Sequence, residues 1–247
     1  FICYNFFMKI NVIYNKDITG YQKVLAETED ILNSNKIEFL TFELSEMQTY
    51  VDFTLVIGGD GTLLKAARFY AKDSIPVLGI NIGRLGFLSQ SGSNGTESVI
   101  NAVINNKYVL EERLMLSSCD TTALNDFVIK GCNPARTSKF YLEINGKCVC
   151  DYIADGLIIS TPTGSTAYGL SAGGPVIYPT LEAGTIVPIC PHTLNARLPV
   201  VPSDEIITIT ASDKMLSISA DGHEPVQIKA PINTKAAGNK ADLGHLQ

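Results

Sequence analysis

No apolar stretch of this sequence approaches the roughly 20 residues that a membrane-spanning helix requires. Basic tracts are also absent and the formal net charge is −6, which argues against a general nucleic-acid-binding protein. The apolar opening, residues 1–7, lacks the basic residues and the cleavage-like site of a signal peptide, and a translation start at Met8 is an equally good interpretation. We therefore expect a cytoplasmic protein that acts without a membrane or a nucleic acid.

The patterns of common metal and nucleotide sites are missing too. The six cysteines include no C-x-x-C pair, and Cys148 and Cys150 would share one face of a strand, which suits reduced thiols that are buried as small hydrophobic residues. The three histidines are not at zinc-ligand spacing, so we expect no metal-ligating residues and a structural role for His192. The absence of G-x-x-x-x-G-K-[ST] and of G-x-G-x-x-G argues against a Walker-type NTPase and a Rossmann dehydrogenase.

What the chain does contain is enough apolar sequence for a sizeable core, at 45% hydrophobic residues over 247 positions. In the first third, β-prone runs alternate with amphipathic helical runs, which predicts a parallel sheet with helices on both faces. The predicted strands are 8–14, 37–42, 53–57 and 75–80, and the predicted helices are 21–32 and 63–70. From residue 107 the segments are short and β-rich, and Asn145-Gly146 predicts a type I′ hairpin turn.

This organisation predicts two domains and a tail. We expect an α/β N-terminal domain with a parallel, Rossmann-like sheet at residues 1–95 and a mostly-β C-terminal domain at 96–229. Residues 230–247 contain few large apolar side chains. The tail is either a loose terminus or a segment that returns to the N-terminal domain.

A glycine-rich turn, GGDGT at residues 58–62, joins the predicted strand at 53–57 to a helix. Three glycines leave the backbone bare, so an anion could approach their N–H groups and the positive end of the helix, which makes Gly58, Gly59 and Thr62 candidate phosphate-binding residues. Asp60 would repel a phosphate unless it has a task. It could accept a proton from an attacking hydroxyl or hold a magnesium ion, and the alternative is that it only caps the helix.

Two further segments combine polar side chains with apolar strands. Residues 155–175 offer small hydroxyls, glycines and Tyr168, which suits a polyhydroxyl or phosphate ligand and stacking on a base; the alternative is a Ser/Thr-rich turn that satisfies its own backbone. Asn125 and Asp126 interrupt an apolar strand, so a bound sugar or a local network should satisfy at least one buried side chain. A structural bulge is the competing explanation. The loop 81–90 could wall the site around Asp60 or be an ordinary loop.

Taken together, these motifs resemble those of the NAD kinase family over most of the chain between Lys9 and Ile228. GGDGT alone also resembles lipid kinases of the diacylglycerol-kinase type and phosphofructokinases, whereas TPTGSTAY together with PICPHTL is highly specific. The matching segments are GGDGT (58–62), NIGRLGFL (81–88), LND (124–126), DGLIISTPTGSTAYGLSAGGP (155–175), PICPHTLNAR (188–197) and DGH (221–223).

The resemblance implies transfer of the γ-phosphoryl group of ATP to the 2′-hydroxyl of the adenosine ribose of NAD, with a divalent cation, Mg²⁺, and a homodimeric or homotetrameric assembly. It implies that Asp60 is the catalytic base. The residues that it places at the nucleotide ligands are Gly61, Lys65, Asn125, Asp126, Arg136, Asp155, Thr166, Ala167, Tyr168, Gly169, Leu170, Ser171 and His223. Asp126 stands where the family more often has glutamate, and His223 where many members have glutamine.

Two other functions stay open at this point. A non-catalytic dinucleotide-binding regulator would keep the pocket, but it would gain affinity by neutralising the Asp60 carboxylate, so the intact aspartate favours the kinase. A lipid kinase is disfavoured by TPTGSTAY in combination with LND.

Overall fold

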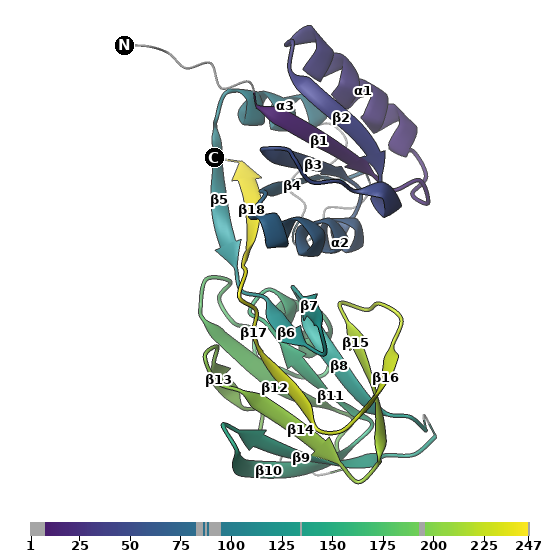
Figure 1. Ribbon diagram of the computed structural model, residues 1–247, viewed down its shortest axis with the longest axis vertical. Coiled ribbons are helices and arrows are strands. Elements are labelled where there is room, and N and C mark those ends of the chain that lie inside the picture. Colours follow the sequence, from purple (N-terminus) through teal and green to yellow (C-terminus); the bar gives the residue numbers. More distant parts are fainter. Residues whose placement is uncertain are drawn as a thin grey trace. The chain divides into compact units, whose positions relative to one another are not determined.

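The computed structural model describes residues 8–82, 86, 88, 95–133, 135–192 and 196–246. The chain divides into two compact units, which Figure 1 shows with their helices and strands labelled. Unit 1 comprises Phe1–Glu112 and Ala241–Gln247, and unit 2 comprises Arg113–Lys240. Within the described ranges, no helix is long and apolar enough to cross a membrane.

Unit 1 is an α/β unit built on a six-stranded sheet with the strand order β2-β1-β3-β4-β18-β5. The pairs β1–β2, β1–β3, β3–β4 and β4–β18 are parallel, which confirms the predicted parallel sheet. The strands are β1 (Lys9–Tyr14), β2 (Glu38–Glu43), β3 (Phe53–Ile57), β4 (Val77–Ile80), β5 (Tyr108–Arg113) and β18 (Ala241–Leu246), and the helices are α1 (Tyr21–Ser34), α2 (Asp60–Tyr70) and α3 (Thr96–Ile104).

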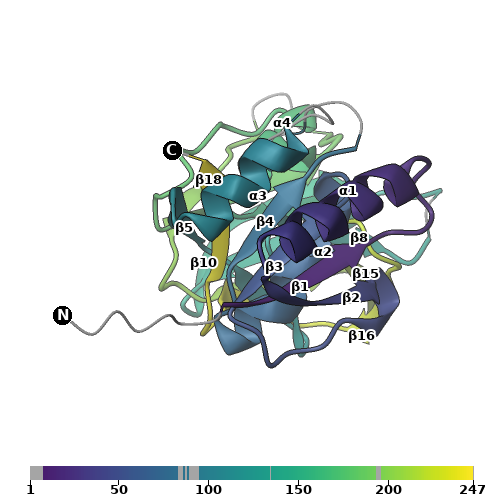
Figure 2. The same ribbon diagram turned by 90° about the horizontal axis from the view of Figure 1, so that it is seen from above.

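Helices cover both faces of this sheet, with α1 and α3 on one face and α2 on the other (Figures 1 and 2). The alternation along β1 explains why, because successive side chains of a strand point to opposite faces. Ile10 and Val12 join the apolar cluster that includes residues of α1 and α3. Between them, Asn11 points to the other face, where its Nδ2 donates to the hydroxyl of Tyr70 on α2 at 3.0 Å.

The end of unit 1 differs from the predicted boundary at residue 95. Helix α3 buries Val99, Ile100 and Val103 completely in the apolar cluster of unit 1, and β5 then joins the sheet beside β18. The tail is divided: β17 (Ile232–Ala236) belongs to a sheet of unit 2, whereas β18 pairs with β4 through Leu243 and Val77. A composition change at the polar segment 91–96 therefore does not mark the end of a folding unit.

Unit 2 is mostly β, as predicted, and consists of two antiparallel six-stranded sheets. Their strand orders are β10-β9-β14-β17-β6-β7 and β13-β12-β11-β8-β15-β16. One apolar core contains fully buried residues of both sheets, among them Phe127 and Phe140. The other strands and the α-helix of this unit are β6 (Leu116–Ser118), β7 (Thr121–Ala123), β8 (Asp126–Gly131), β9 (Ser138–Ile144), β10 (Lys147–Ala154), β11 (Gly156–Ser160), α4 (Tyr168–Ser171), β12 (Ala183–Ile189), β13 (Val200–Pro202), β14 (Ile207–Ala211), β15 (Met215–Ala220) and β16 (Val226–Lys229).

The hairpin β9–β10 confirms one prediction and corrects another. Asn145 and Gly146 connect the two strands with φ of +49° and +72°, and a type I′ turn requires positive φ at both positions. The two cysteines of β10 were expected to be buried on one face. Instead, the register shifts between Cys148 and Cys150, so that Cys148 is exposed and only Cys150 packs against the core. The described cysteines are free thiols.

Candidate active site

The carboxylate of Asp60 lies at the start of α2, directly after the buried strand β3. Gly59 is the N-cap residue, in an extended conformation, and Asp60 is the first residue of the helix. The predicted alternative, in which Asp60 caps the helix, is therefore wrong, because that position belongs to Gly59. The side chain of Asp60 is half-buried, and its Oδ1 accepts a hydrogen bond from the backbone N–H of Leu88 at 3.4 Å.

Gly86 presses directly against this carboxylate. A Cβ atom built on Gly86 would lie 2.1 Å from Oδ1 and 2.5 Å from Oδ2 of Asp60, so no side chain fits at this position unless the carboxylate moves. The loop after β4 thus contacts the GGDGT turn, in line with the expectation that it walls the same site. Gly83 and Phe87 of this loop lie outside the described residues.

Gly58 and Thr62, two of the predicted phosphate-binding residues, hold the turn together. The N–H of Gly58 donates to the carbonyl of Ile80 at 3.0 Å, and a Cβ on Gly58 would lie 2.6 Å from the side chain of Thr62. Thr62 is buried, its N–H donates to the carbonyl of Gly59 at 3.0 Å, and its Oγ1 accepts from Nδ2 of Asn15 at 3.3 Å. The sequence did not predict that Gly58 and Thr62 stabilise the turn, because their partners follow β1 and end β4, and only the fold brings these strand ends next to the turn.

Gly59 and Gly61 are glycines that the fold itself does not require. Neither has a positive φ, and a Cβ built on either would meet no atom within 4 Å. What their bare backbone provides is access for another molecule to the N–H groups at the positive end of α2. Lys65, one turn further along α2, is exposed.

In unit 2, Asn125 and Asp126 are held through their backbone by a third polar residue. Asp221, in the turn after β15, accepts hydrogen bonds from three consecutive N–H groups: those of Leu124 at 2.9 Å, Asn125 at 2.7 Å and Asp126 at 3.1 Å. Asn125 precedes β8, and Asp126 is the first residue of that strand, paired with Ser160. The predicted bulge is therefore wrong, because the pair stands at the start of the strand, where the backbone of Asn125 is bonded by a side chain instead.

The side chains of this pair are buried without full compensation. Asp126 is 4% exposed, and burial, followed by the nearby charge of Asp221, raises the pKa of its carboxyl to about 7. Oδ1 of Asn125 is also buried and has no hydrogen-bond partner within the described residues. A buried polar atom without a partner costs about 1–3 kcal/mol, so the predicted local network accounts for the backbone but not for the side chains. Hydroxyl groups of a ligand would supply the missing partners.

The loop after β11 packs onto the same backbone. Oγ1 of Thr161 donates to the carbonyl of Leu124 at 2.5 Å and accepts from the N–H of Gly164 at 3.0 Å. A Cβ on Gly164 would lie 2.0 Å from the carbonyl oxygen of Asn125, so only glycine allows this approach. The structure therefore brings the TPTGST segment and the LND segment together.

Several hydroxyls of this loop are used inside it. Oγ of Ser165 donates to the carbonyl of Pro162 at 2.6 Å, and Oγ1 of Thr166 donates to the carbonyl of Thr163 at 3.2 Å. For these side chains the alternative prediction, a turn that satisfies its own backbone, describes the contacts that are present. Thr166 is half-buried, so its hydroxyl oxygen keeps acceptor capacity for a ligand.

The next predicted site residues fall on α4 and the residue before it. Tyr168 is 40% exposed, so part of this aromatic residue is accessible to a ligand. Gly169 is the buried residue of α4, and its Cβ position would be in ordinary contact with Ser160 at 3.6 Å. The others are half-buried or exposed: Ala167, Leu170 and Ser171.

Arg136 and Asp155 come together at the opposite end of β11 from Thr161, because Asp155 immediately precedes this strand and Thr161 follows it. With Ala135, Thr137 and His192 they line an open cavity of about 550 Å³. His192 is exposed, and its backbone N–H donates to the backbone carbonyl of Ile153 at 2.8 Å. The predicted structural role of His192 accounts for its backbone hydrogen bond but not for its position in the lining of the cavity. The position of His192 in the PICPHTL segment was a sequence signal for a place in the site.

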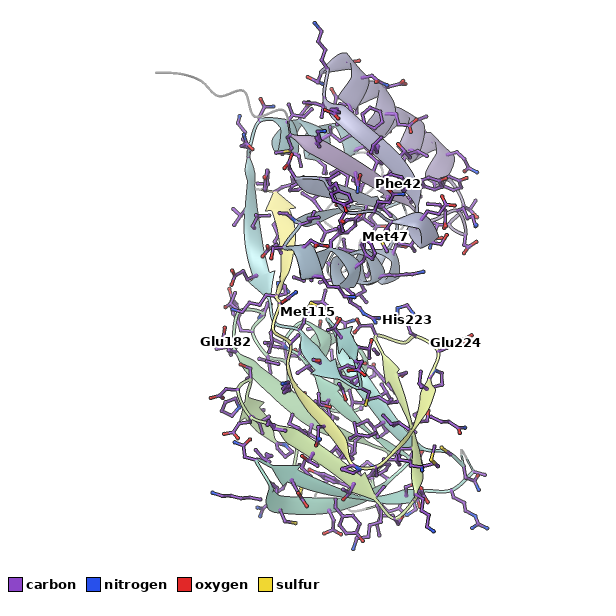
Figure 3. The ribbon with its side chains drawn as sticks, viewed as in Figure 1. Phe42, Met47, Met115, Glu182, His223 and Glu224 are labelled. Atoms are coloured by element: carbon purple, nitrogen blue, oxygen red, sulfur yellow. The ribbon has the colours of Figure 1, made fainter. Side chains whose placement is uncertain are left out.

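His223 lies two residues after Asp221 on the connection between β15 and β16 (Figure 3). It is exposed, and its backbone N–H donates to the backbone carbonyl of Ala220 at 2.9 Å. Within the DGH motif the predicted ligand contact is His223, whereas Asp221 accepts the three hydrogen bonds from the LND segment.

The family model described as the ATP-NAD kinase N-terminal domain matches residues 8–108, and that of the ATP-NAD kinase C-terminal domain matches residues 124–236. The chain is 38% identical over 234 residues to the NAD kinase of Clostridium tetani, covering 88% of this chain and 84% of that protein. It is 37% identical over 253 residues to the NAD kinase of Clostridium beijerinckii, covering 97% and 89%.

Solved structures give the same result. The crystal structure of an NAD kinase from Archaeoglobus fulgidus in complex with ATP is similar with a TM-score of 0.84 and 28% identity, covering 97% of this chain and 94% of that chain. Yeast NADH kinase, crystallised with NADH, has a TM-score of 0.84 at 23% identity, covering 97% and 84%, which indicates a shared fold.

Proposed function

This chain belongs to the ATP-NAD kinase family, and we propose that Asp60 is the base of the reaction that it catalyses. The protein is an NAD kinase: it transfers the γ-phosphoryl group of ATP to the 2′-hydroxyl of the adenosine ribose of NAD and so makes NADP. The observation that carries the role of Asp60 is its setting, a half-buried carboxylate against Gly86, beside two glycines that the fold does not require.

The chemistry needs a proton acceptor at the attacking hydroxyl. A ribose hydroxyl is a weak nucleophile, and its oxygen must lose a proton as it bonds to the γ-phosphorus. In our proposal the carboxylate of Asp60 accepts that proton while the bond between the γ-phosphorus and the bridging oxygen breaks, and ADP leaves with the electron pair.

The phosphate groups of ATP require donors that reach them without side chains in between. The N–H groups around Gly59 and Gly61 can serve, since a Cβ on either glycine would stand in open space. Lys65 extends from α2 one turn later and can add a positive charge. Gly58 and Thr62 support this arrangement by fixing the turn.

A magnesium ion fits these residues only if phosphate oxygens supply most of its ligands. Within the described residues no group of three or more histidine, cysteine, aspartate or glutamate side chains could hold a metal ion. Mg²⁺ keeps several waters and is bound in kinases largely through substrate phosphates, so the phosphates of ATP would hold it here, and Asp60 keeps the single role of proton acceptor. When bound, the ion neutralises charge on the transferring phosphoryl group.

We assign recognition of the dinucleotide to residues of unit 2. Oδ1 of Asn125, which has no hydrogen-bond partner among the residues that the structure describes, suits a ribose hydroxyl as donor, and the carboxyl of Asp126 suits a second hydroxyl. The exposed ring of Tyr168 suits stacking on a base or nicotinamide ring. The other proposed ligand contacts are Arg136, Asp155, Thr166, Ala167, Gly169, Leu170, Ser171 and His223.

Location and assembly complete the proposal. The resemblance to NAD kinases implies a cytoplasmic enzyme that acts as a homodimer or homotetramer, without membrane or nucleic-acid partners. Size-exclusion chromatography coupled to light scattering measures the mass directly. A mass of one 26.7 kDa chain at assay concentrations would contradict the oligomer.

The function is tested by identifying the product. The protein is incubated with ATP, MgCl₂ and NAD, with omission of each component as a control, and the product is analysed by mass spectrometry and by a dehydrogenase that uses only NADP. We expect NADP. A preparation that binds NAD but forms no NADP would support the regulator, and phosphorylation of diacylglycerol instead of NAD would support the lipid kinase.

A further inference from the structure

Asp221 has no role in the chemistry described so far, yet it makes three hydrogen bonds to the LND segment. One carboxylate oxygen accepts from the N–H of Asn125 at 2.7 Å and from that of Asp126 at 3.1 Å, and the other oxygen accepts from Leu124 at 2.9 Å. The N–H of Asp221 donates back to the carbonyl of Asp126 at 2.9 Å. Four hydrogen bonds thus join two segments that are 95 to 97 residues apart.

The shape of the turn explains how Asp221 reaches these groups. Asp221 and Gly222 both have positive φ, +48° and +73°. Aspartate tolerates this conformation better than most residues, and glycine adopts it without strain. The turn therefore directs the Asp221 carboxylate at the start of β8 and fixes the backbone that carries Asn125 and Asp126.

We propose that Asp221 is a positioning residue for the dinucleotide site, which orients Asn125 and Asp126 by holding three consecutive backbone N–H groups. This inference rests on the proposed function, since it takes the two side chains as ligand contacts. Charge-assisted hydrogen bonds to backbone N–H groups are stronger than neutral ones, so the carboxylate is well suited to the task. It acts through its neighbours and touches no reacting atom.

The proposal also has an electrostatic consequence. Among the described residues, Asp126 neighbours Asp221, whose carboxylate accepts from its N–H, and Ser160, its uncharged partner on β11. His223 follows Asp221 by two residues in the same turn. Burial is the largest cause of the raised pKa of Asp126, and the negative charge of Asp221 is the second. Removal of that charge should lower the pKa of Asp126. A substitution that alters only the packing and keeps the charge at residue 221 should leave the pKa of Asp126 unchanged.

The test compares Asp221→Asn with wild type, with Asp213→Asn as the matched control. Asparagine has one acceptor oxygen, and its NH₂ group would face a backbone N–H, so at least one of the three bonds is lost. Asp213 is an aspartate of the same unit that accepts from Ser138 beside Gly131, at the opposite end of β8. Steady-state kinetics give KM and kcat for NAD and ATP across pH, and calorimetry gives NAD affinity.

For Asp221→Asn we expect the KM for NAD to rise by about tenfold or more, with a smaller change in kcat and in the KM for ATP. Because burial and Asp221 raise the pKa of Asp126 to about 7, we also expect NAD affinity to change near this pH in the wild type and at a lower pH in Asp221→Asn. Asp213→Asn should match the wild type. A folded Asp221→Asn protein with unchanged KM and an unchanged pH profile would overturn the proposal.

A second variant covers the case in which Asp221→Asn fails to fold. Asp221→Glu keeps the charge and both acceptor oxygens, so it should fold, retain the pH transition near 7 and show a KM for NAD between wild type and Asp221→Asn. Asp221→Glu with wild-type KM and a displaced pH transition would also overturn the inference. If the wild type makes no NADP, the proposed function fails instead, and the calorimetric comparison still decides the role of Asp221.

Discussion

Substitution of Asp126 by asparagine should change how the stability of the ligand-free protein depends on pH. The pKa of Asp126 is raised from 3.8 to about 7 in the folded protein, so the folded state binds more protons than the unfolded state between these values. Stability contributed at this residue is therefore present below pH ~4 and is lost as the pH rises toward ~7. Asparagine does not titrate, so Asp126→Asn should lose less stability over the same range.

The magnitude follows from the size of the pKa shift. Each pKa unit corresponds to about 1.4 kcal/mol, so a rise from 3.8 to about 7 corresponds to about 4 kcal/mol at full ionisation. Asp126 is 4% exposed, so solvent screening reduces this value little. Relative to the wild type, Asp126→Asn should gain free energy of unfolding by up to about 4 kcal/mol between pH 4 and pH 8.

Urea unfolding at a series of pH values measures this difference. The chain has no tryptophan, so tyrosine fluorescence and far-ultraviolet circular dichroism are the signals. Asp126 belongs to unit 2, so the unfolding transition of unit 2 is the one to compare between wild type and variant. Asp204→Asn, at an exposed aspartate of the same unit, is the control and should show a much smaller pH-dependent difference. A difference between wild type and Asp126→Asn that stays constant from pH 4 to pH 8 would refute the reasoning.

Three further substitutions test other contacts. Gly86→Ala would place a Cβ 2.1 Å from Oδ1 of Asp60, so the carboxylate must move and kcat should fall by about 10²-fold. Circular dichroism should stay unchanged. An unaltered kcat would show that the position of the carboxylate does not depend on Gly86. The Cβ that Gly61→Ala adds meets no atom within 4 Å, so the melting temperature should rise slightly while the KM for ATP increases. An unchanged KM for ATP would show that Gly61 is not part of the phosphate site. Glu182→Gln breaks the exposed ion pair with Lys240 at 2.8 Å, and urea unfolding should show a loss below about 1 kcal/mol; a larger loss would contradict the view that solvent screens this pair.

The fold class could be predicted because the periods of the apolar residues differ between the two parts of the chain. The alternation of short β-prone runs with helical runs predicted unit 1, and Asn145-Gly146 predicted a hairpin that is present. The return of the tail to the N-terminal domain was one of two predicted alternatives, but the strand with which β18 pairs could not be predicted. ADLGHL is short and contains few large apolar residues, and its partner β4 lies far away in the sequence, so no local pattern pairs them.

The site was predictable where one short segment carries the chemistry and not where two segments meet. Asp60 stands out because a carboxylate among glycines needs an explanation, and Asn125 and Asp126 stand out because they interrupt an apolar run. The contact of Gly86 with Asp60 and the bonds of Asp221 to Asn125 depend on tertiary approach over 26 and 96 positions of the sequence. Spacing within a motif carries no information about such contacts.

The central claim is that Asp60 accepts the proton of the attacking hydroxyl, and the turnover of Asp60→Asn tests it most directly. NADP formation is measured under single-turnover conditions for the wild type and the variant, and a thermal-shift titration confirms that both bind NAD. A positioned base contributes about 10²- to 10⁴-fold, so we expect a loss of that size in the rate with NAD binding retained. Asp60→Asn with wild-type turnover would contradict the account.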